Sequence, residues 1–486
     1  MTAWLMKIGV AALAAAVKMS GDSARWLYGV IAPVCRDATG ATATMLAVAL
    51  PGLIGMGALG AETGAWFTTK LQNQSAADSA VIAAAYEVIA GKTDVAGELT
   101  AAATEAARRN GYKGSAPTVV SPYNDGVVTN GVAVTLQQTQ GSLLAAMFLP
   151  SVTIANRAVA VIEVLDSLCI LALRTGGTDV EIGALVQVGM PNCSVAANST
   201  GSRAIDLIGS TSSIAAATLV TAGEVAVNGN PIDPASPPPE IMLSTPALIG
   251  ATKIADPYAG VLTHSFLTTG MPKTVACGSS LVGGVQIYSG NCVIAGSSLT
   301  QPKIKLAAGT QISGVWSILT GQTVDLGPGS YWVTGNLSLQ SGAVLGCSTC
   351  DNVQGTGVTI ILTAQANEIG ALSTASGAML NLNAPRWGQF AGLVIVQDSN
   401  NLPHGTTYTS RHSSIGGKPG GSLNGLVYFP NSSLTFHGVP SSIGPKCLLL
   451  VGNAVIIDAT SNLDNAGCAA AGLTNTPVIK KVALAE

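Results

Sequence analysis

Cysteines are the residues of this sequence with the clearest chemical potential, and their number and spacing point to disulfides. Cys35 lies near the N-terminus, and eight others follow it much later: Cys169, Cys193, Cys277, Cys292, Cys347, Cys350, Cys447 and Cys468. An even number in one part of a chain is typical of disulfides formed in an oxidising compartment. The sequence alone does not determine the pairing, and buried free thiols are the alternative. Pairing of near neighbours is the simplest arrangement: Cys169–Cys193, Cys277–Cys292, Cys347–Cys350 and Cys447–Cys468.

The Cys347-Ser-Thr-Cys350 spacing is also found in zinc and redox sites. A structural zinc site needs a second pair of ligands, and the sequence has no second CxxC. A redox role needs a thioredoxin-like βαβ setting, which the surrounding residues do not provide. A loop disulfide is therefore the favoured interpretation of this pair.

Acidic residues are sparse in the C-terminal half and do not form pairs. After Cys277 they are Asp325, Asp351, Glu368, Asp398, Asp458, Asp464 and Glu486. Glycoside hydrolysis needs two carboxylates within about 5–10 Å, and no single strand could present two of these side by side. A pair assembled across neighbouring strands stays open. His404 and His412 lack a nearby acidic or cysteine partner, so the sequence predicts no catalytic residue, no cofactor and no metal site.

The composition excludes some classes of protein. Charged residues make up 10% of the chain, aromatic residues 4%, and the net charge is −3. Soluble α/β enzymes usually carry about 25% charged residues, so a β-rich extracytoplasmic protein fits better. Without a basic stripe, nucleic acid is not expected as a partner.

One stretch near the N-terminus has the length and composition of a transmembrane helix. Residues 38–61 contain no charged side chain, and as a helix they would measure roughly 36 Å, enough to cross a hydrocarbon core of about 30 Å. Residues 1–37 carry Lys7, Lys18, Arg25 and Arg36, which predicts a cytoplasmic tail and an exported C-terminus. A signal peptide built on residues 8–17 is the less favoured alternative.

The next hundred residues, 62–166, are expected to form an α+β domain. Thr63–Ala90 is rich in alanine and should be helical, and a second helix should run from about Val95 to Arg109. Four β-branched segments with Asn-Gly and Asp-Gly turns follow, which predicts a small antiparallel sheet: 118–121, 127–136, 152–155 and 158–165.

From residue 167 to the end the sequence changes to many short apolar runs separated by Gly, Asn or Ser. Strands this short and this closely spaced predict an irregular right-handed parallel β-helix-like domain, with a β-sandwich as the rival. Residues 228–276 contain five prolines between Pro231 and Pro239 and are expected to form an extended excursion from the coil.

A family resemblance rests on the residues that follow the apolar stretch. Leu50-Pro51, Glu62, Gly64-Ala65-Trp66, Leu71-Gln72 and Ala76-Ala77-Asp78-Ser79-Ala80 resemble the N-terminal segment of TadG-like proteins of the bacterial tight-adherence (Flp) pilus. Looser similarity continues at VTIANRAVAV (152–161), CSVAANS (193–199), ADPYA (255–259) and GLVYFP (425–430). Prepilin-like members are cut after a Gly that precedes a Glu, and the residues after Gly40 include no such Glu, so the anchor should stay uncleaved.

The resemblance implies a non-enzymatic component of the pilus assembly machine, anchored once in the inner membrane with its C-terminal domains in the periplasm or outside. Its expected partners are the inner membrane, other pilus-assembly proteins and minor pilin-like subunits. The residues expected to pack against partner helices are Glu62, Trp66, Leu71, Ala76, Ala80 and Ala84. Packing of this helix on its own domain is the alternative. The alternative is a membrane-tethered β-helix that binds or cleaves extracellular polysaccharide, for which the sequence offers no specific support.

Overall fold

The computed structural model describes residues 40–485 with several internal gaps: 95–96, 127, 143–145, 147–149, 210, 352, 365–368, 401, 403–411, 417–420, 438–446 and 474–475. The predicted cytoplasmic tail 1–37 and the first two residues of the predicted span lie outside the described residues. The chain folds as two compact units. The first ends at Ile162 and includes the C-terminal residues from Val482, and the second spans Glu163–Lys481.

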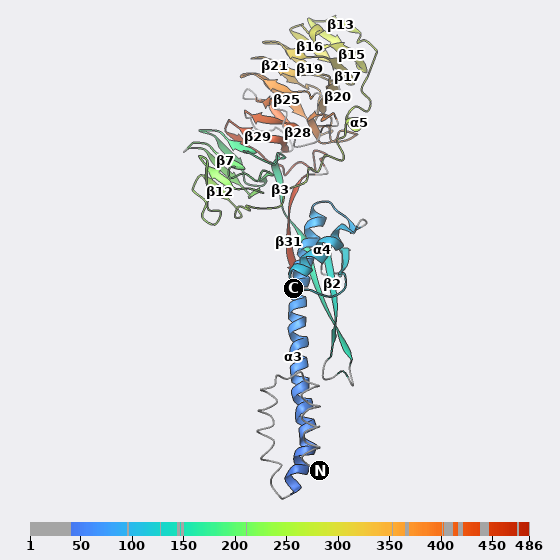
Figure 1. Ribbon diagram of the computed structural model, residues 1–486. Helices are drawn as coiled ribbons and strands as arrows, with labels where there is room; N and C mark the ends of the chain where they lie inside the picture. Colours follow the sequence, from blue (N-terminus) through green and yellow to red (C-terminus); the bar gives the residue numbers. More distant parts are fainter. Residues whose placement is uncertain are drawn as a thin grey trace. The chain divides into compact units, whose positions relative to one another are not determined.

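The first unit is built on one long helix, α3 (Gly40–Ile89), which runs without a break through the apolar stretch and the alanine-rich segment (Figure 1). The sequence had predicted two helices here, and Pro51 lies inside α3 without ending it. A second helix, α4 (Glu98–Arg109), is capped by Asn110, and Gly111 then adopts a positive φ of 84°. Within the described part of the chain, a search for a helix both long and apolar enough to cross a bilayer finds none.

An antiparallel sheet completes this unit, as the sequence predicts. Its strands are β1 (Thr118–Tyr123), β2 (Gly131–Gly141) and β3 (Ser151–Ala172), with Val134 of β2 opposite Val119 of β1 and Ala158 of β3. The Asn124-Asp125-Gly126 turn joins β1 to β2, where the Asp125 carboxylate accepts the Val128 N–H at 2.7 Å. The structure has a single 22-residue β3 where the sequence suggested two strands.

The second unit is mostly β, and its C-terminal part consists of three sheets of parallel strands. The first sheet contains β14 (Val285–Tyr288), β16 (Lys303–Leu306), β19 (Thr323–Leu326), β22 (Val344–Gly346), β25 (Met379–Asn383) and β28 (Ser422–Phe436). The second contains β15 (Cys292–Ala295), β17 (Thr310–Ser313), β20 (Gly329–Val333), β23 (Val358–Leu362), β26 (Leu393–Gln397) and again β28. The third contains β18 (Trp316–Ile318), β21 (Leu337–Leu339) and β24 (Leu372–Thr374).

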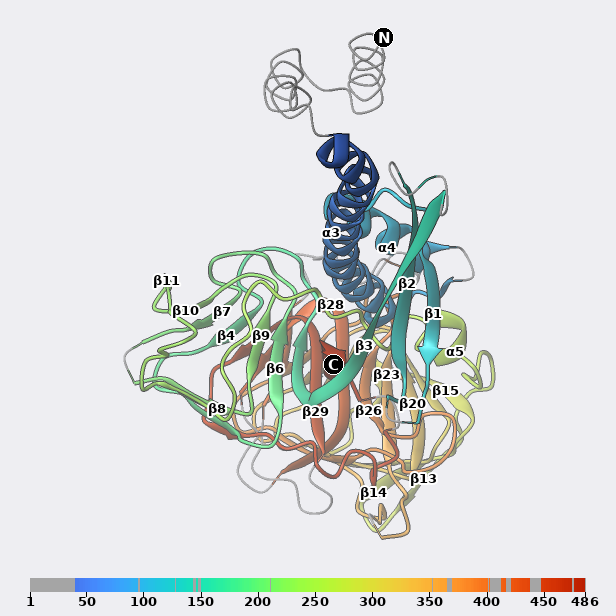
Figure 2. The ribbon, with the colours of Figure 1, turned by 90° about the horizontal axis from the view of Figure 1, so that it is seen from below.

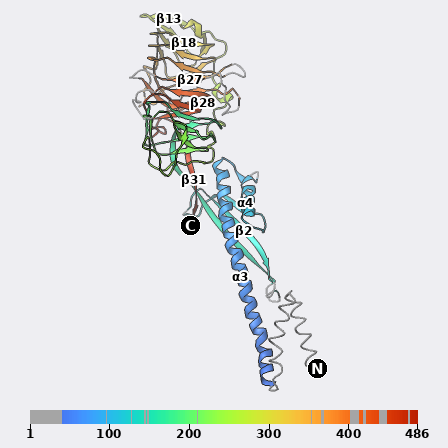
Figure 3. The same ribbon diagram turned by 60° about the vertical axis from the view of Figure 1, so that its left-hand side comes forward.

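Consecutive strands visit these sheets in turn, so that equivalent residues stack. In the first sheet Ile304 lies opposite Val324, which lies opposite Leu345. Side chains of all three sheets meet in one core, which includes Ile304, Ile312 and Trp316. Shorter elements complete this region: η3 (Gly296–Ser298), β27 (His412–Ile415), which pairs with β28, and β13 (Ser279–Val282), which forms a hairpin with β14 (Figure 3).

The earlier strands of this unit stack on its last ones, so the sheets are not built in sequence order. Strand β29 (Leu448–Ile457) pairs with β28 and also with β3 and β4 (Val180–Ile182). The stacking continues through β6 (Ser194–Ala197), β7 (Ile205–Leu207), β9 (Leu219–Thr221) and β10 (Val225–Val227). Another sheet joins β30 (Ser461–Asn462), β5 (Gln187–Met190), β8 (Ser213–Ala216) and β12 (Ile241–Leu243). In Figure 2 β3 lies beside the red strand β29, and β6 and then β9 follow on the other side of β3.

The predicted excursion 228–276 is shorter than expected, because its first part holds β11 (Asn230–Pro231), which pairs with β10, and β12. Its second part, residues 251–271, contains α5 (His264–Leu267) and is called the strap here. Side chains of the strap form a second core on the outer face of the strands, and Trp332 donates its indole N–H to the Leu267 carbonyl at 2.8 Å. The last strand, β31 (Val478–Ala485), begins beside β3, where Leu168 N–H donates to the Pro477 carbonyl.

Candidate functional site

The C-terminal half of α3 holds the small residues that the sequence singled out for helix packing. Ala76, Ala80 and Ala84 are fully buried in the core of the first unit, together with Leu99 and Ala103 of α4. Their small side chains let α4 and β2 approach α3 closely. They therefore lie inside their own unit rather than on its surface.

The other predicted packing residues lie about one to four turns earlier on α3. Leu71 is 56% exposed and the neighbouring Phe67 is 62% exposed, whereas Trp66 is partly buried. Glu62 is buried although it carries a charge. Leu71 and Phe67 therefore form the apolar surface that α3 offers beside its buried alanines, and Phe67 was not among the residues predicted from sequence.

Hydrogen bonds fix α3 on the sheet at this level. The Asn156 amide of β3 donates to the Gln74 side-chain oxygen at 2.9 Å, and the Gln74 amide donates to Asp78 at 2.9 Å. Tyr112, after α4, donates its hydroxyl to the Gln137 carbonyl of β2 at 2.6 Å. The part of α3 that follows Phe67 and Leu71 is thus held in place by the sheet.

The N-terminal half of α3 exposes a series of large apolar side chains: Leu53, Ile54, Met56 and Leu59. Further along, the hydroxyls of Thr63, Thr68 and Thr69 each donate to the carbonyl four residues earlier. Such bonds satisfy a hydroxyl within the helix itself.

Comparison with protein families gives a match over this helix. The family model described as Putative Flp pilus-assembly TadE/G-like matches residues 40–87. This segment of the chain is TadE/G-like. The resemblance found between Leu50 and Ala80 is confirmed, and it links the chain to Flp pilus assembly. The looser similarity at 152–161, 193–199, 255–259 and 425–430 lies outside this match. Neither the curated proteins nor the solved structures give a match.

Outside the TadE/G-like segment, the structure joins the eight cysteines in four disulfides: Cys169–Cys193, Cys277–Cys292, Cys347–Cys350 and Cys447–Cys468. These coincide with the near-neighbour pairs that the sequence favours. Cys169 of β3 and Cys193, next to β6, lie on adjacent strands of one sheet, so their bond links successive levels of the stack. The Cys347–Cys350 bond closes a short loop after β22.

Two of the acidic residues that the sequence analysis considered are engaged in local contacts. Asp325 accepts hydrogen bonds from the backbone and hydroxyl of Ser348, both at 2.7 Å, and Asp458 lies 2.7 Å from a ring nitrogen of His437. His412 belongs to β27, while His404 and Glu368 lie outside the described residues. Among the residues that the structure describes, no cluster of three or more His, Cys, Asp or Glu could hold a metal ion.

Two ion pairs that involve buried aspartates escaped the sequence analysis. Arg174 donates to Asp179 at 3.1 Å, and Arg203 lies 2.6 Å from Asp206. Both aspartates are buried, and Asp179 also accepts the Ser199 N–H at 2.7 Å. Burial raises the pKa of Asp179 to about 7, although its hydrogen bonds with Arg174 and Ser199 oppose the shift. In the sequence, only the short spacing between each arginine and its aspartate could have indicated these ion pairs. Such spacing is also common in solvent-exposed turns.

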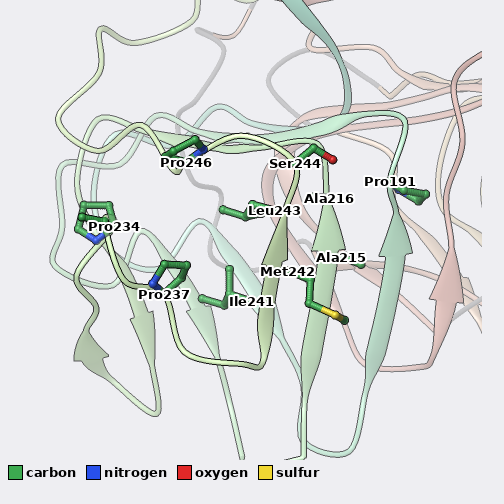
Figure 4. Close-up of a pocket in the computed structure, with 11 residues that line it drawn as sticks. Pro191, Ala215, Ala216, Pro234, Pro237, Ile241, Met242, Leu243, Ser244 and Pro246 are labelled. Carbon is green, nitrogen blue, oxygen red and sulfur yellow. The ribbon is translucent and has the colours of Figure 1, made fainter.

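A cavity of about 600 Å³ lies beside β8 and β12 (Figure 4). Proline and aliphatic side chains dominate its lining, and Ser244 contributes a hydroxyl: Pro191, Ala215, Ala216, Pro234, Ala235, Pro237, Ile241, Met242, Leu243, Ser244 and Pro246. Among the described residues that line it, none is acidic or basic.

Proposed function

We propose that this chain is a non-enzymatic component of a tight-adherence (Flp) pilus assembly machine and that it acts through protein–protein contacts. The TadE/G-like match over residues 40–87 carries the proposal. The exposed pair Phe67 and Leu71 lies within that segment, and aromatic and aliphatic side chains of this kind are common at the centres of protein interfaces. We take this pair as the contact surface for another pilus-assembly protein or a minor pilin-like subunit.

The proposal includes anchoring in the inner membrane by residues 38–61, with the N-terminus in the cytoplasm. Its support is the absence of charge between Asp37 and Glu62 and the basic residues that precede this stretch. The exposed Leu53, Ile54 and Leu59 add support, because removing apolar surface from water is favourable by about 25 cal/mol for each Å². The four disulfides fit an exported location for the second unit.

We also infer that the parallel sheets of the second unit are the faces of one β-helix-like coil. The support is that successive strands visit the three sheets in turn and share one core. We expect a right-handed coil, since about 98% of crossovers between parallel strands of one sheet are right-handed. In this role the second unit would act as a rigid projecting surface.

The experiment that tests the function is a gene deletion in a strain that carries Flp pili. We expect the deletion to remove surface pili and the wild-type gene to restore them, while Asp325→Asn and Asp458→Asn variants restore them equally well. Normal piliation in the deletion strain would refute the role in assembly. Loss of rescue by one carboxylate variant that folds normally would favour an enzymatic role.

A further inference from the structure

Strand β12 is the outermost strand of its sheet, and one of its two edges has no neighbouring strand. It pairs in parallel with β8 alone. The Glu240 carbonyl accepts a hydrogen bond from β8 at 2.9 Å, and the Ser244 N–H donates to β8 at 3.3 Å. Because successive peptide groups of a strand face opposite edges, those of Ile241 and Leu243 face away from β8.

Most of these outward peptide groups are unpaired. The Ile241 N–H donates to the Pro238 carbonyl at 2.9 Å. Over the part of the chain that the structure describes, no hydrogen bond reaches the Ile241 carbonyl or the N–H and carbonyl of Leu243. A strand edge with free N–H and carbonyl groups is a template for another strand. Proteins usually protect such an edge with a lysine, a proline or a bulge, and the three residues of β12 show none of these.

Two columns of stacked apolar side chains also end at β12. They are formed by residues that lie opposite one another in β5, β8 and β12: Val188, Ile214 and Ile241 in one column, and Met190, Ala216 and Leu243 in the other. Ile241 belongs to the main core of the second unit, and Leu243 is half-buried against it. Figure 4 shows both side chains on the side of β12 that faces Pro234 and Pro237, at the cavity of about 600 Å³. A further strand at this edge would continue both columns.

We propose that the free edge of β12 and the adjoining cavity bind an extended peptide segment of a partner protein, with apolar side chains such as valine at alternate positions. The free groups of Ile241 and Leu243 need N–H and carbonyl partners at strand spacing, which a peptide backbone supplies. Two side chains at positions i and i+2 of that segment would extend the two columns.

The chemistry of the cavity narrows the occupant further. None of the described residues that line it is acidic or basic, so the bound segment should carry no charge there, because a buried unpaired charge is costly. A fatty acyl chain could fill the apolar space but cannot pair with the N–H and carbonyl of Leu243. This site goes beyond the proposed assembly role and does not depend on it, since all of its residues belong to the second unit.

The test is titration of a fluorescent peptide with the purified full chain, kept in solution by an amphipathic polymer and with its disulfides intact. The probe is Gly-Ser-Val-Ser-Val-Ser-Gly, labelled at its N-terminus and amidated at its C-terminus, and fluorescence anisotropy measures its binding. We expect saturable binding with a Kd of about 100 μM or tighter. Replacing both valines with aspartate should weaken binding about tenfold or more, because these side chains enter the apolar cavity.

N-methylation of the probe separates strand pairing from simple filling of an apolar cavity. Alternate residues of an added strand direct their N–H groups toward β12, so methylation of the valines and methylation of the serines should have unequal effects. One of these peptides should lose about tenfold or more in affinity, and the other should bind nearly as tightly as the unmodified probe.

Two variants test the protein side of the site. Leu243→Pro removes the free N–H and leaves the hydrogen bonds between β12 and β8 in place, so the folded variant should bind the probe about tenfold more weakly. Pro237→Trp fills the cavity from its loop wall without changing β12 and should have a similar effect. Val282→Ala shortens an exposed apolar side chain of β13 and should leave binding unchanged.

Three results would overturn the proposal. The first is the absence of saturable binding of the valine peptide to the folded wild-type chain. The second is an equal effect of the two methylation patterns, which would show that the cavity takes apolar groups without strand pairing. The third is wild-type affinity in folded Leu243→Pro and Pro237→Trp. Thermal unfolding of each variant shows whether it is folded.

Discussion

A ring nitrogen of His264 lies 2.6 Å from the carboxylate of Asp398, and this contact ties the strap to the end of β26. Asp398 is fully buried and also accepts the Thr363 hydroxyl at 2.9 Å. Removal of the histidine leaves a buried carboxylate short of one partner. The strap is therefore an integral part of the second unit, held by polar contacts as well as by its apolar side chains.

His264→Ala should destabilise the second unit by about 1–3 kcal/mol, the usual cost of leaving a buried polar group without its partner. The measurement is chemical denaturation of the purified chain. His412→Ala is the matched control, because His412 is exposed on β27 and should tolerate the change. Equal stability of His264→Ala and the wild type would show that the contact contributes nothing.

Leu53→Arg combined with Ile54→Arg should release the chain from the membrane. Each arginine near the centre of a bilayer costs about 2.5–3.5 kcal/mol on insertion scales. The measurement is the fraction that remains in the membrane after a carbonate wash. Thr68→Arg, an exposed position after Glu62, is the control and should stay membrane-bound. Full retention of the double variant would mean that residues 38–61 are not the anchor.

All eight cysteines of the second unit should resist alkylation until a reductant is added. Replacing Cys169 and Cys193 with serine should lower the melting temperature more than the same change at Cys347 and Cys350. Their sequence separations are 24 and 3 residues, and a loop of about 15 residues already contributes roughly 3 kcal/mol in the chain-entropy model. Free reaction of all eight in the unreduced protein would contradict both the disulfides and the export of this unit.

Asp179 should make the second unit less stable as the pH rises. Its pKa in the folded chain is about 7, above the ordinary value near 3.8, so the folded state binds the proton more tightly than the unfolded state. Its contribution is complete below pH 4 and is lost as the pH rises to 7 and beyond. Asp179→Asn should therefore gain stability relative to the wild type between pH 5 and pH 8, as urea denaturation can measure. A relative loss over that interval would reverse the assigned shift.

The local features of this fold could be predicted from sequence patterns. The Asn124-Asp125-Gly126 turn, the stop after Arg109 and the near-neighbour cysteine pairs all depend on residues close together in the chain. The stacking of β29 on β3 could not be predicted, because parallel pairing between such distant segments leaves no periodic signal. The packing of the strap could not be predicted for the same reason. The prolines at 231–239 suggested that all of residues 228–276 leave the coil, whereas Tyr258 and Leu267 of the strap pack on distant strands.

The candidate site shows a similar division. The family resemblance and the exposed Leu71 were accessible from sequence, whereas the burial of Ala76, Ala80 and Ala84 within their own unit depended on how α4 folds back on α3. Small residues at helical spacing fit both arrangements.

The surface of the TadE/G-like segment provides the most direct test of the proposed function. The measurement is the number of surface pili on deletion cells that express Phe67→Ser combined with Leu71→Ser at wild-type abundance. We predict that these cells lack pili although the purified variant unfolds at the wild-type temperature, because both side chains are exposed. Ala80→Leu, in contrast, should lower that temperature by overpacking the core. Normal piliation by the folded Phe67→Ser and Leu71→Ser variant would contradict the claim that this surface acts in pilus assembly.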